Sequence, residues 1–190
     1  MNKSDVVENI CQTLLKGNKG KAQSLAKADY PFQFHLKEQR KITFLQSVKL
    51  ILRDGFIDRY SGQRLVYPGI LRLISQIMPQ EFPFQKNWKM SECHIAYYEL
   101  LPTIDHVIPV ARGGSDDESN WVTTSMLRNS AKSNWTLEEL GWSLFPAGNI
   151  KDWDGLINLY IELFESILES QSVLSQNKIL LNWYKLAKQS

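Results

Sequence analysis

Between residues 105 and 132 the sequence concentrates side chains that can bind a metal ion and move a proton. Asp105 and His106 are adjacent, Asn120 lies fourteen residues after His106, and Asn129 lies nine residues further on. A carboxylate and an amide oxygen are hard ligands of the kind that Mg²⁺ prefers. An imidazole with an ordinary pKa near ~6.5 can act as a general base at neutral pH. The stretch therefore predicts metal-assisted hydrolysis with an imidazole that deprotonates water.

The elements that must position these residues follow from the local pattern. Residues 103–108 are β-like, residues 112–117 read as a Gly-containing loop, and residues 121–124 form a short β-branched run. Ser125 is a good N-cap for a helix that carries Asn129 and Lys132. The sequence thus predicts a strand, a long turn, a second strand and a helix in succession.

This stretch closely resembles the HNH endonucleases. In that family an Asp-His-x-x-Pro strand end precedes a Gly-rich turn, a central Asn, and a His or Asn on the next helix. The matching residues here are Asp105, His106, Pro109, Gly113, Gly114, Asn120 and Asn129. Both intervals agree with the family, and the resemblance covers about residues 53–139, most securely 103–134.

The resemblance implies a ββα-metal core with defined roles. Asp105 and Asn129 would share one divalent cation, and His106 would take a proton from the attacking water. Asn120 would hold the loop that aims His106. Because both protein ligands are oxygens, the expected cofactor is Mg²⁺, with Mn²⁺ as a substitute.

Charged residues near the motif have less defined roles. Arg112 lies in the turn between the strands, and Lys132 lies one helical turn after Asn129, so both are candidate phosphate contacts. An ordinary surface charge is the alternative for each. The acidic run 116–118 is expected to be a solvated turn, and His35 and His94 are expected to be packed or solvated rather than functional.

One feature departs from the family pattern. Many relatives bind a structural zinc through two CxxC pairs, whereas the matching positions here are Asp58, Ser61, Ser125 and Arg128. No structural zinc is therefore expected. We expect Asp58 and Arg128 to form an ion pair in its place, with Ser61 and Ser125 hydrogen-bonded beside them.

The rest of the chain predicts an α+β, mainly helical fold in which N- and C-terminal helices flank the ββα core. The expected regions are a basic helical region at 1–54, a nuclease core at 55–145 with an insertion at 63–100, and C-terminal helices at 146–190 packed on the core. Residues 1–54 hold ten Lys and Arg against five Asp and Glu, which suits phosphate binding. Apolar spacing predicts helices over 4–14, 38–53, 70–77 and 156–167. Residues 16–21 are expected to form a basic loop, and residues 65–67 a short strand.

Bulk properties exclude several classes of protein. No apolar run is long enough to span a membrane, and no secretory signal is visible at the N-terminus. The two cysteines, Cys11 and Cys93, form no CxxC pair, so a disulfide framework is not expected. The expected location is the cytoplasm.

These observations together predict an endonuclease that cuts DNA and leaves 5′-phosphate and 3′-hydroxyl ends. A restriction-type or mobile-element enzyme fits better than a secreted toxin. The alternatives are a non-cleaving nucleic-acid-binding module and an RNA-directed nuclease or toxin. The apolar stripe at 156–167 could form a homodimer, although such a stripe more commonly covers the core.

Overall fold

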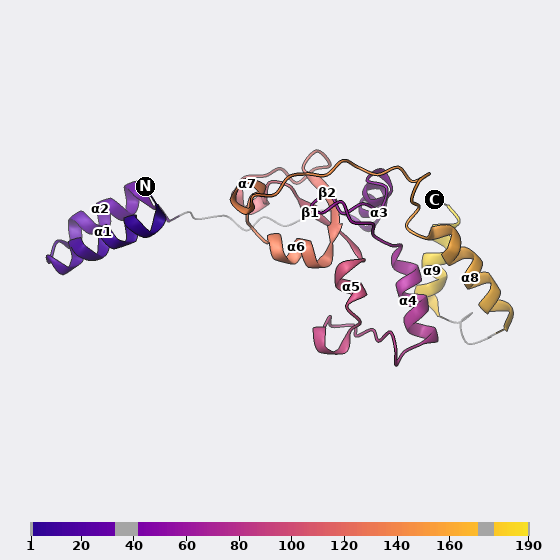
Figure 1. Ribbon diagram of the computed structural model, residues 1–190. Helices are drawn as coiled ribbons and strands as arrows, with labels where there is room; N and C mark the ends of the chain where they lie inside the picture. Colours follow the sequence, from indigo (N-terminus) through magenta and orange to yellow (C-terminus); the bar gives the residue numbers. More distant parts are fainter. Residues whose placement is uncertain (1, 33–41, 171–176, 190) are drawn as a thin grey trace. The chain divides into compact units, whose positions relative to one another are not determined.

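The computed structural model describes residues 2–32, 42–170 and 177–189 (Figure 1). The chain divides into two compact units, Met1–Leu36 and Lys37–Ser190. Each unit is described by itself. The histidine at position 35, expected to be packed or solvated, and the expected helical residues 38–41 lie outside the described residues.

The first unit is a pair of helices. α1 (Lys3–Leu15) begins with a capping box between Asn2 and Asp5, and α2 (Lys19–Asp29) is capped by the Asn18 side chain, which accepts a hydrogen bond from the backbone of Lys21. The two helices pack against each other. The predicted loop at 16–21 is shorter than expected, because a capping side chain allows α2 to begin inside it despite a glycine at position 20.

The second unit contains the predicted strand, turn, strand and helix. β1 (Pro102–His106) and β2 (Trp121–Ser125) pair antiparallel, with Asp105 opposite Val122 and His106 opposite Trp121. α6 (Met126–Lys132) begins where β2 ends, and the Ser125 hydroxyl accepts a hydrogen bond from the backbone of Arg128. The α+β, mainly helical fold with a ββα core is confirmed.

The outer edge of β2 is covered by a turn instead of a third strand. α3 (Phe44–Arg53) packs against both strands and is followed by Asp54, which is fully buried. The carboxylate of Asp54 accepts a hydrogen bond from the backbone of Thr123 at 2.8 Å, and the backbone of Arg59 donates to the Thr123 carbonyl at 2.8 Å. Both backbone groups of Thr123 at this edge are thereby satisfied. The expected boundary at residue 54 therefore falls inside this unit.

A helical layer adjoins the ββα core. α4 (Pro68–Ile77), α8 (Ile157–Ser170) and α9 (Lys178–Ala187) lie side by side (Figure 1). Buried aromatic and aliphatic side chains fill the space between them, among them Tyr67, Leu73, Tyr160, Phe164 and Leu180. The apolar stripe of α8 thus covers the core of its own chain.

Short elements connect these parts. They are η1 (Met90–Glu92), α5 (Ala96–Glu99), η2 (Val110–Arg112) and α7 (Leu137–Leu140). The predicted strand at 65–67 is wrong. Its backbone N–H groups bond to the carbonyls of three separate residues, Phe56, Leu100 and Gly155, so this apolar run is a buried connection and does not pair with one partner strand.

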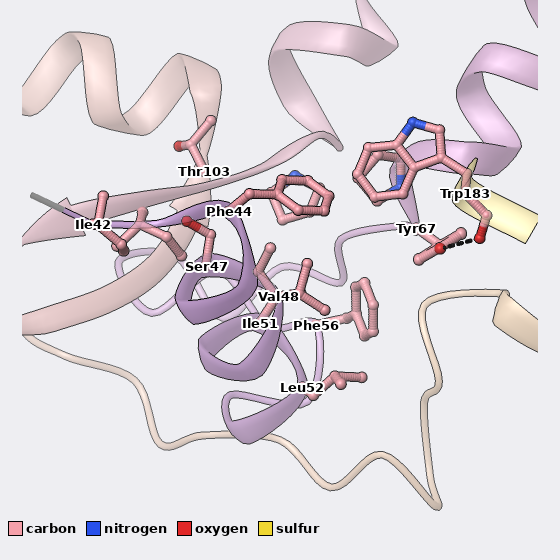
Figure 2. A pocket seen from close by; sticks show the side chains of 13 residues that line it. Ile42, Phe44, Ser47, Val48, Ile51, Leu52, Phe56, Tyr67, Thr103 and Trp183 are labelled. Carbon is pink, nitrogen blue, oxygen red and sulfur yellow. Dashed lines mark hydrogen bonds between the residues drawn. The ribbon is translucent and has the colours of Figure 1, made fainter. Parts of the chain in front are cut away.

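An apolar cavity of about 270 Å³ lies between α3, β1 and the Trp183 side chain of α9 (Figure 2). Its lining includes Phe44, Ile51, Phe56 and, from β1, Ile104. No helix in the described part of the chain has the length and apolar character to cross a membrane.

Candidate active site at the end of β1

Asp105 is buried near the end of β1, and one of its oxygens is already engaged. Its side chain is 4% exposed, and Oδ2 accepts a hydrogen bond from the Tyr60 hydroxyl at 2.8 Å and pairs with Lys132 Nζ at 2.9 Å. Burial raises the pKa of Tyr60 and the negative charge of Asp105 raises it further, so the phenol stays protonated and donates. Oδ1 accepts no hydrogen bond from the residues that the structure describes.

Lys132 does not lie at the surface, so its prediction as an exposed phosphate contact is wrong. The residue is fully buried, and its ammonium donates to the His106 carbonyl at 2.7 Å as well as pairing with Asp105. The helical period correctly places Lys132 on the face of α6 that carries Asn129. That face is turned toward β1, and the long side chain reaches the buried carboxylate.

Asn129 is held against the same strand. Its amide nitrogen donates to Thr103 Oγ1 and to the Ile104 carbonyl, each at 3.1 Å. The amide oxygen accepts no hydrogen bond within the described part of the chain. An unpartnered carboxylate oxygen of Asp105 and an unpartnered amide oxygen of Asn129 therefore come from neighbouring elements, and both suit a hard cation.

This oxygen pair is a small ligand set. Across residues 2–32, 42–170 and 177–189, no cluster of three or more His, Cys, Asp or Glu side chains is arranged to hold a metal. A cation bound by Asp105 and Asn129 would need water or substrate oxygens for its remaining positions, as Mg²⁺ commonly does.

His106 is oriented by its two neighbours. Its side chain is 4% exposed, Nε2 lies 2.8 Å from Asp116 Oδ1, and Trp121 Nε1 lies 2.9 Å from the same Nε2. The other ring nitrogen, Nδ1, is buried and has no hydrogen-bond partner among the described residues. Buried polar atoms are rarely left unpaired, and those that are often serve a function.

The contact with Asp116 corrects the prediction of a solvated turn at 116–118. The Asp116 side chain is 14% exposed and directed toward the imidazole. The sequence carried no signal for this contact, because one acidic residue among three consecutive ones cannot be singled out by its type.

Asn120 fastens the loop between the strands. Its amide nitrogen donates to the carbonyls of Ile108 and Ser115, each at 2.8 Å, and its amide oxygen accepts from the backbone of Ile108 at 2.9 Å. Gly114 makes the closure possible, since a Cβ there would lie 1.9 Å from the Ile108 carbonyl oxygen. This geometry is what the predicted role of Asn120 requires.

Arg112 is partly buried. Its guanidinium donates to the Asn134 carbonyl and pairs with Glu139, each at 3.3 Å. These contacts tie the inter-strand turn to the start of α7. A role in phosphate binding stays a prediction.

The positions that match the zinc ligands do meet, but not through the expected ion pair. Asp58 is fully buried, and its carboxylate accepts hydrogen bonds from the Tyr60 backbone at 2.9 Å, the Thr124 hydroxyl at 3.0 Å and the Ser125 backbone at 3.0 Å. Arg128 makes no ion pair with Asp58 and lies over the Trp142 ring at 5.6 Å. The predicted pair is wrong because backbone and hydroxyl donors already satisfy the carboxylate.

The two serines at these positions have local roles. Ser125 caps α6, and the Ser61 hydroxyl accepts a hydrogen bond from the Gln63 backbone at 3.3 Å. Asp58 thus joins the 58–61 turn to the start of α6, which is the junction that a zinc ion would hold.

His94 lies apart from this site. Its ring stacks on Phe82 with centroids 4.0 Å apart, and its Nδ1 accepts a hydrogen bond from the Ala96 backbone. It is a packed histidine, as predicted.

Comparison with protein families supports the motif. Residues 91–125 match the family model described as HNH endonuclease. The matched segment includes β1, the inter-strand loop and β2, and it ends before Asn129. Comparisons with curated proteins and with solved structures give no match. The matched segment contains Asp105, His106 and Asn120, and only two cysteines occur in the chain. Over residues 91–125 the chain is therefore similar to the HNH endonucleases, and its two cysteines form no CxxC pair.

Proposed function

We propose that the protein is a metal-dependent endonuclease that hydrolyses phosphodiester bonds in DNA and leaves 5′-phosphate and 3′-hydroxyl ends. One observation carries the proposal: His106 keeps a buried ring nitrogen, Nδ1, without a hydrogen-bond partner among the described residues, while its other nitrogen contacts Asp116. A ring held in this way presents one nitrogen that can accept a proton, and the adjacent Asp105 keeps one carboxylate oxygen without a partner in the described part of the chain.

The residues present fit a divalent cation. Asp105 Oδ1 and the Asn129 amide oxygen would hold it, and this oxygen pair favours Mg²⁺ or Mn²⁺. When bound, the cation would stabilise negative charge on the phosphate and on the departing 3′-oxygen.

The protein's own groups would do the remaining work. His106 would accept the proton of the attacking water at Nδ1, and Asn120 would keep the loop closed so that the imidazole holds its position. Lys132 would limit the negative charge that Asp105 presents at this site. Water reaches the ring only after a small local opening, because the His106 side chain is 4% exposed.

DNA is the proposed substrate, and a restriction-type or mobile-element role is the proposed biological setting. The excess of Lys and Arg over residues 1–54 supports contact with a polyanion. RNA offers the same phosphates, so the substrate test must include both polymers.

The test is digestion of supercoiled plasmid and of a structured RNA with Mg²⁺, with Mn²⁺ and with EDTA. We expect nicked or linear DNA only with a divalent cation, and a loss of about 10²-fold or more in rate for His106→Ala. His94→Ala is the matched control, because it removes the same ring from a packed site away from the motif. Equal cleavage by His106→Ala and the unchanged protein would refute the proposal.

One observation favours a second candidate function, nucleic-acid binding without cleavage. The carboxylate expected to hold the cation is already paired with Lys132. Retention of DNA in a gel-shift assay, with no nicking at any Mg²⁺ or Mn²⁺ concentration, would establish this alternative in place of the first.

A further inference from the structure

We propose that the carboxylate of Asp116 holds His106 in the tautomer that carries its proton on Nε2, and that Trp121 would impose the opposite tautomer if this carboxylate were removed. The proposal rests on three atoms that meet at one point. His106 Nε2, Trp121 Nε1 and Asp116 Oδ1 are separated by 2.8, 2.9 and 3.2 Å.

The position of the proton follows from what each atom can do. The indole Nε1 always carries a hydrogen and only donates, whereas a carboxylate oxygen only accepts. At 2.8 Å from an imidazole nitrogen, the oxygen of Asp116 would face a lone pair unless that nitrogen carried the proton. The indole hydrogen of Trp121 lies within reach of both His106 Nε2 at 2.9 Å and Asp116 Oδ1 at 3.2 Å. With a proton on Nε2 it is donated to the carboxylate, which also accepts from His106, and Nδ1 keeps its lone pair.

Without Asp116, the same geometry favours the other state. Trp121 Nε1 lies 2.9 Å from His106 Nε2 and approaches it with the rings perpendicular, so the indole hydrogen can be donated only to an unprotonated Nε2. The imidazole proton would then move to Nδ1. In a buried site, a tautomer that leaves the Trp121 donor without an acceptor is disfavoured.

The consequence for catalysis rests on the proposed function. If His106 carries its proton on Nδ1, this nitrogen has no lone pair and cannot accept a proton. Nδ1 is the ring nitrogen that has no hydrogen-bond partner among the described residues. Asp116 is therefore a positioning residue, and Trp121 is the group that makes its presence decisive.

The test reads the tautomer directly by ¹⁵N NMR of the histidine rings at a pH where the His106 signals no longer move. With only three histidines in the chain, His106 is assigned by comparison with His106→Ala. We expect the unchanged protein to show the hydrogen on Nε2, and Asp116→Ala to show it on Nδ1. Asp116→Ala/Trp121→Phe removes both constraints, and we expect its Nε2-protonated fraction to recover.

Two variants serve as controls. Glu118→Gln removes the same charge from an exposed position in the same turn, and Trp121→Phe removes the indole while keeping Asp116. Both are expected to keep the hydrogen on Nε2. A proton on Nδ1 in the unchanged protein, or an Asp116→Ala spectrum identical to it, would overturn the proposal. The first of these results needs His106→Ala only for the assignment and needs no variant of Asp116 or Trp121.

A kinetic arm separates this proposal from the proposed function. We expect Asp116→Ala to lower kcat for DNA cleavage by about 10²-fold with little change in KM, and the added Trp121→Phe change to restore part of it. If no version of the protein cleaves, the proposed function fails while the NMR result still decides the tautomer. If the unchanged protein cleaves and Asp116→Ala cleaves equally well, the positioning role fails alone.

Discussion

Replacing Lys132 by methionine tests the buried ion pair at the centre of the site. Lys132 is fully buried, the Asp105 side chain is 4% exposed, and their charged atoms lie 2.9 Å apart. Methionine has a similar length and no charge, so the substitution leaves Asp105 with only the Tyr60 hydroxyl on Oδ2. The main effect is therefore an uncompensated buried carboxylate.

The magnitude follows from the burial of both partners. Removing one member of a buried ion pair costs about 3–5 kcal/mol, because the remaining charge loses its partner without regaining water. With a urea slope of about 2 kcal/mol/M, the unfolding midpoint should fall by roughly 2 M. Tryptophan fluorescence is the appropriate signal, since all six tryptophans lie in the unit Lys37–Ser190.

Added cation should distinguish the variant from the unchanged protein. In Lys132→Met the carboxylate of Asp105 is free to attract a divalent ion, and Mn²⁺ at ten times its Kd would return about 1.4 kcal/mol. In the unchanged protein Lys132 already neutralises that carboxylate, so Mn²⁺ should bind more weakly and stabilise less. The measurement is a set of urea titrations with EDTA and with increasing Mn²⁺.

Two variants control for other causes. Lys49→Met removes an exposed lysine from α3 and should change the unfolding free energy by no more than about 0.5 kcal/mol. Asp105→Asn/Lys132→Met removes both charges and should recover part of the loss. A loss below about 1 kcal/mol in Lys132→Met, or equal stabilisation of both proteins by Mn²⁺, would refute the reasoning.

The remaining predictions concern the junction at Asp58 and the buried tyrosines. Asp58→Ala leaves three buried donors without their acceptor, and we expect urea titration to show a loss of about 3 kcal/mol or more; a change no larger than that of exposed Asp152→Ala would contradict this. Cysteines placed together at positions 58, 61, 125 and 128 should bind one Co²⁺ with thiolate charge-transfer absorption, whereas cysteines at 58 and 61 alone should not. Burial raises the pKa of Tyr60, Tyr67 and Tyr160, so the unfolded chain loses these protons first as the pH rises. The contribution of these tyrosines to the unfolding free energy should therefore be fully present below pH ~10 and fall above it by about 1.4 kcal/mol per pH unit for each tyrosine. Tyr160→Phe should reduce the pH dependence of the unfolding free energy by the share of one tyrosine. An unchanged pH dependence in this variant would contradict the prediction.

Local signals in the sequence were sufficient for the core of the fold. The β-branched run at 121–124, the adjacent Gly113 and Gly114, and the capping hydroxyl of Ser125 each act within a few residues. They therefore specify β1, the turn, β2 and α6 before any long-range packing is known. The helical period also placed Asn129 and Lys132 on one face of α6.

Signals of this kind failed where a segment takes its partners from distant parts of the chain. Residues 65–67 have the composition of a strand, yet their backbone bonds to three unrelated segments. The start of α2 was missed because its burial is slight and its apolar pattern is weak, with Ala22 as its buried residue. At 65–67 the tertiary environment outweighed local preference, whereas α2 begins at a local cap, the Asn18 side chain.

The environment of each charge was decided by the tertiary structure alone. A sequence states that Lys132, Asp116 and Asp58 are charged, but it does not state what covers them. Folding brings Lys132 onto Asp105, Asp116 onto His106, and the backbone of Ser125 onto Asp58. The residue types and spacing thus determined which chemistry this protein can attempt. Burial and neighbours far apart in the chain determined which atoms remain free for it, because desolvation and hydrogen bonding depend on three-dimensional proximity.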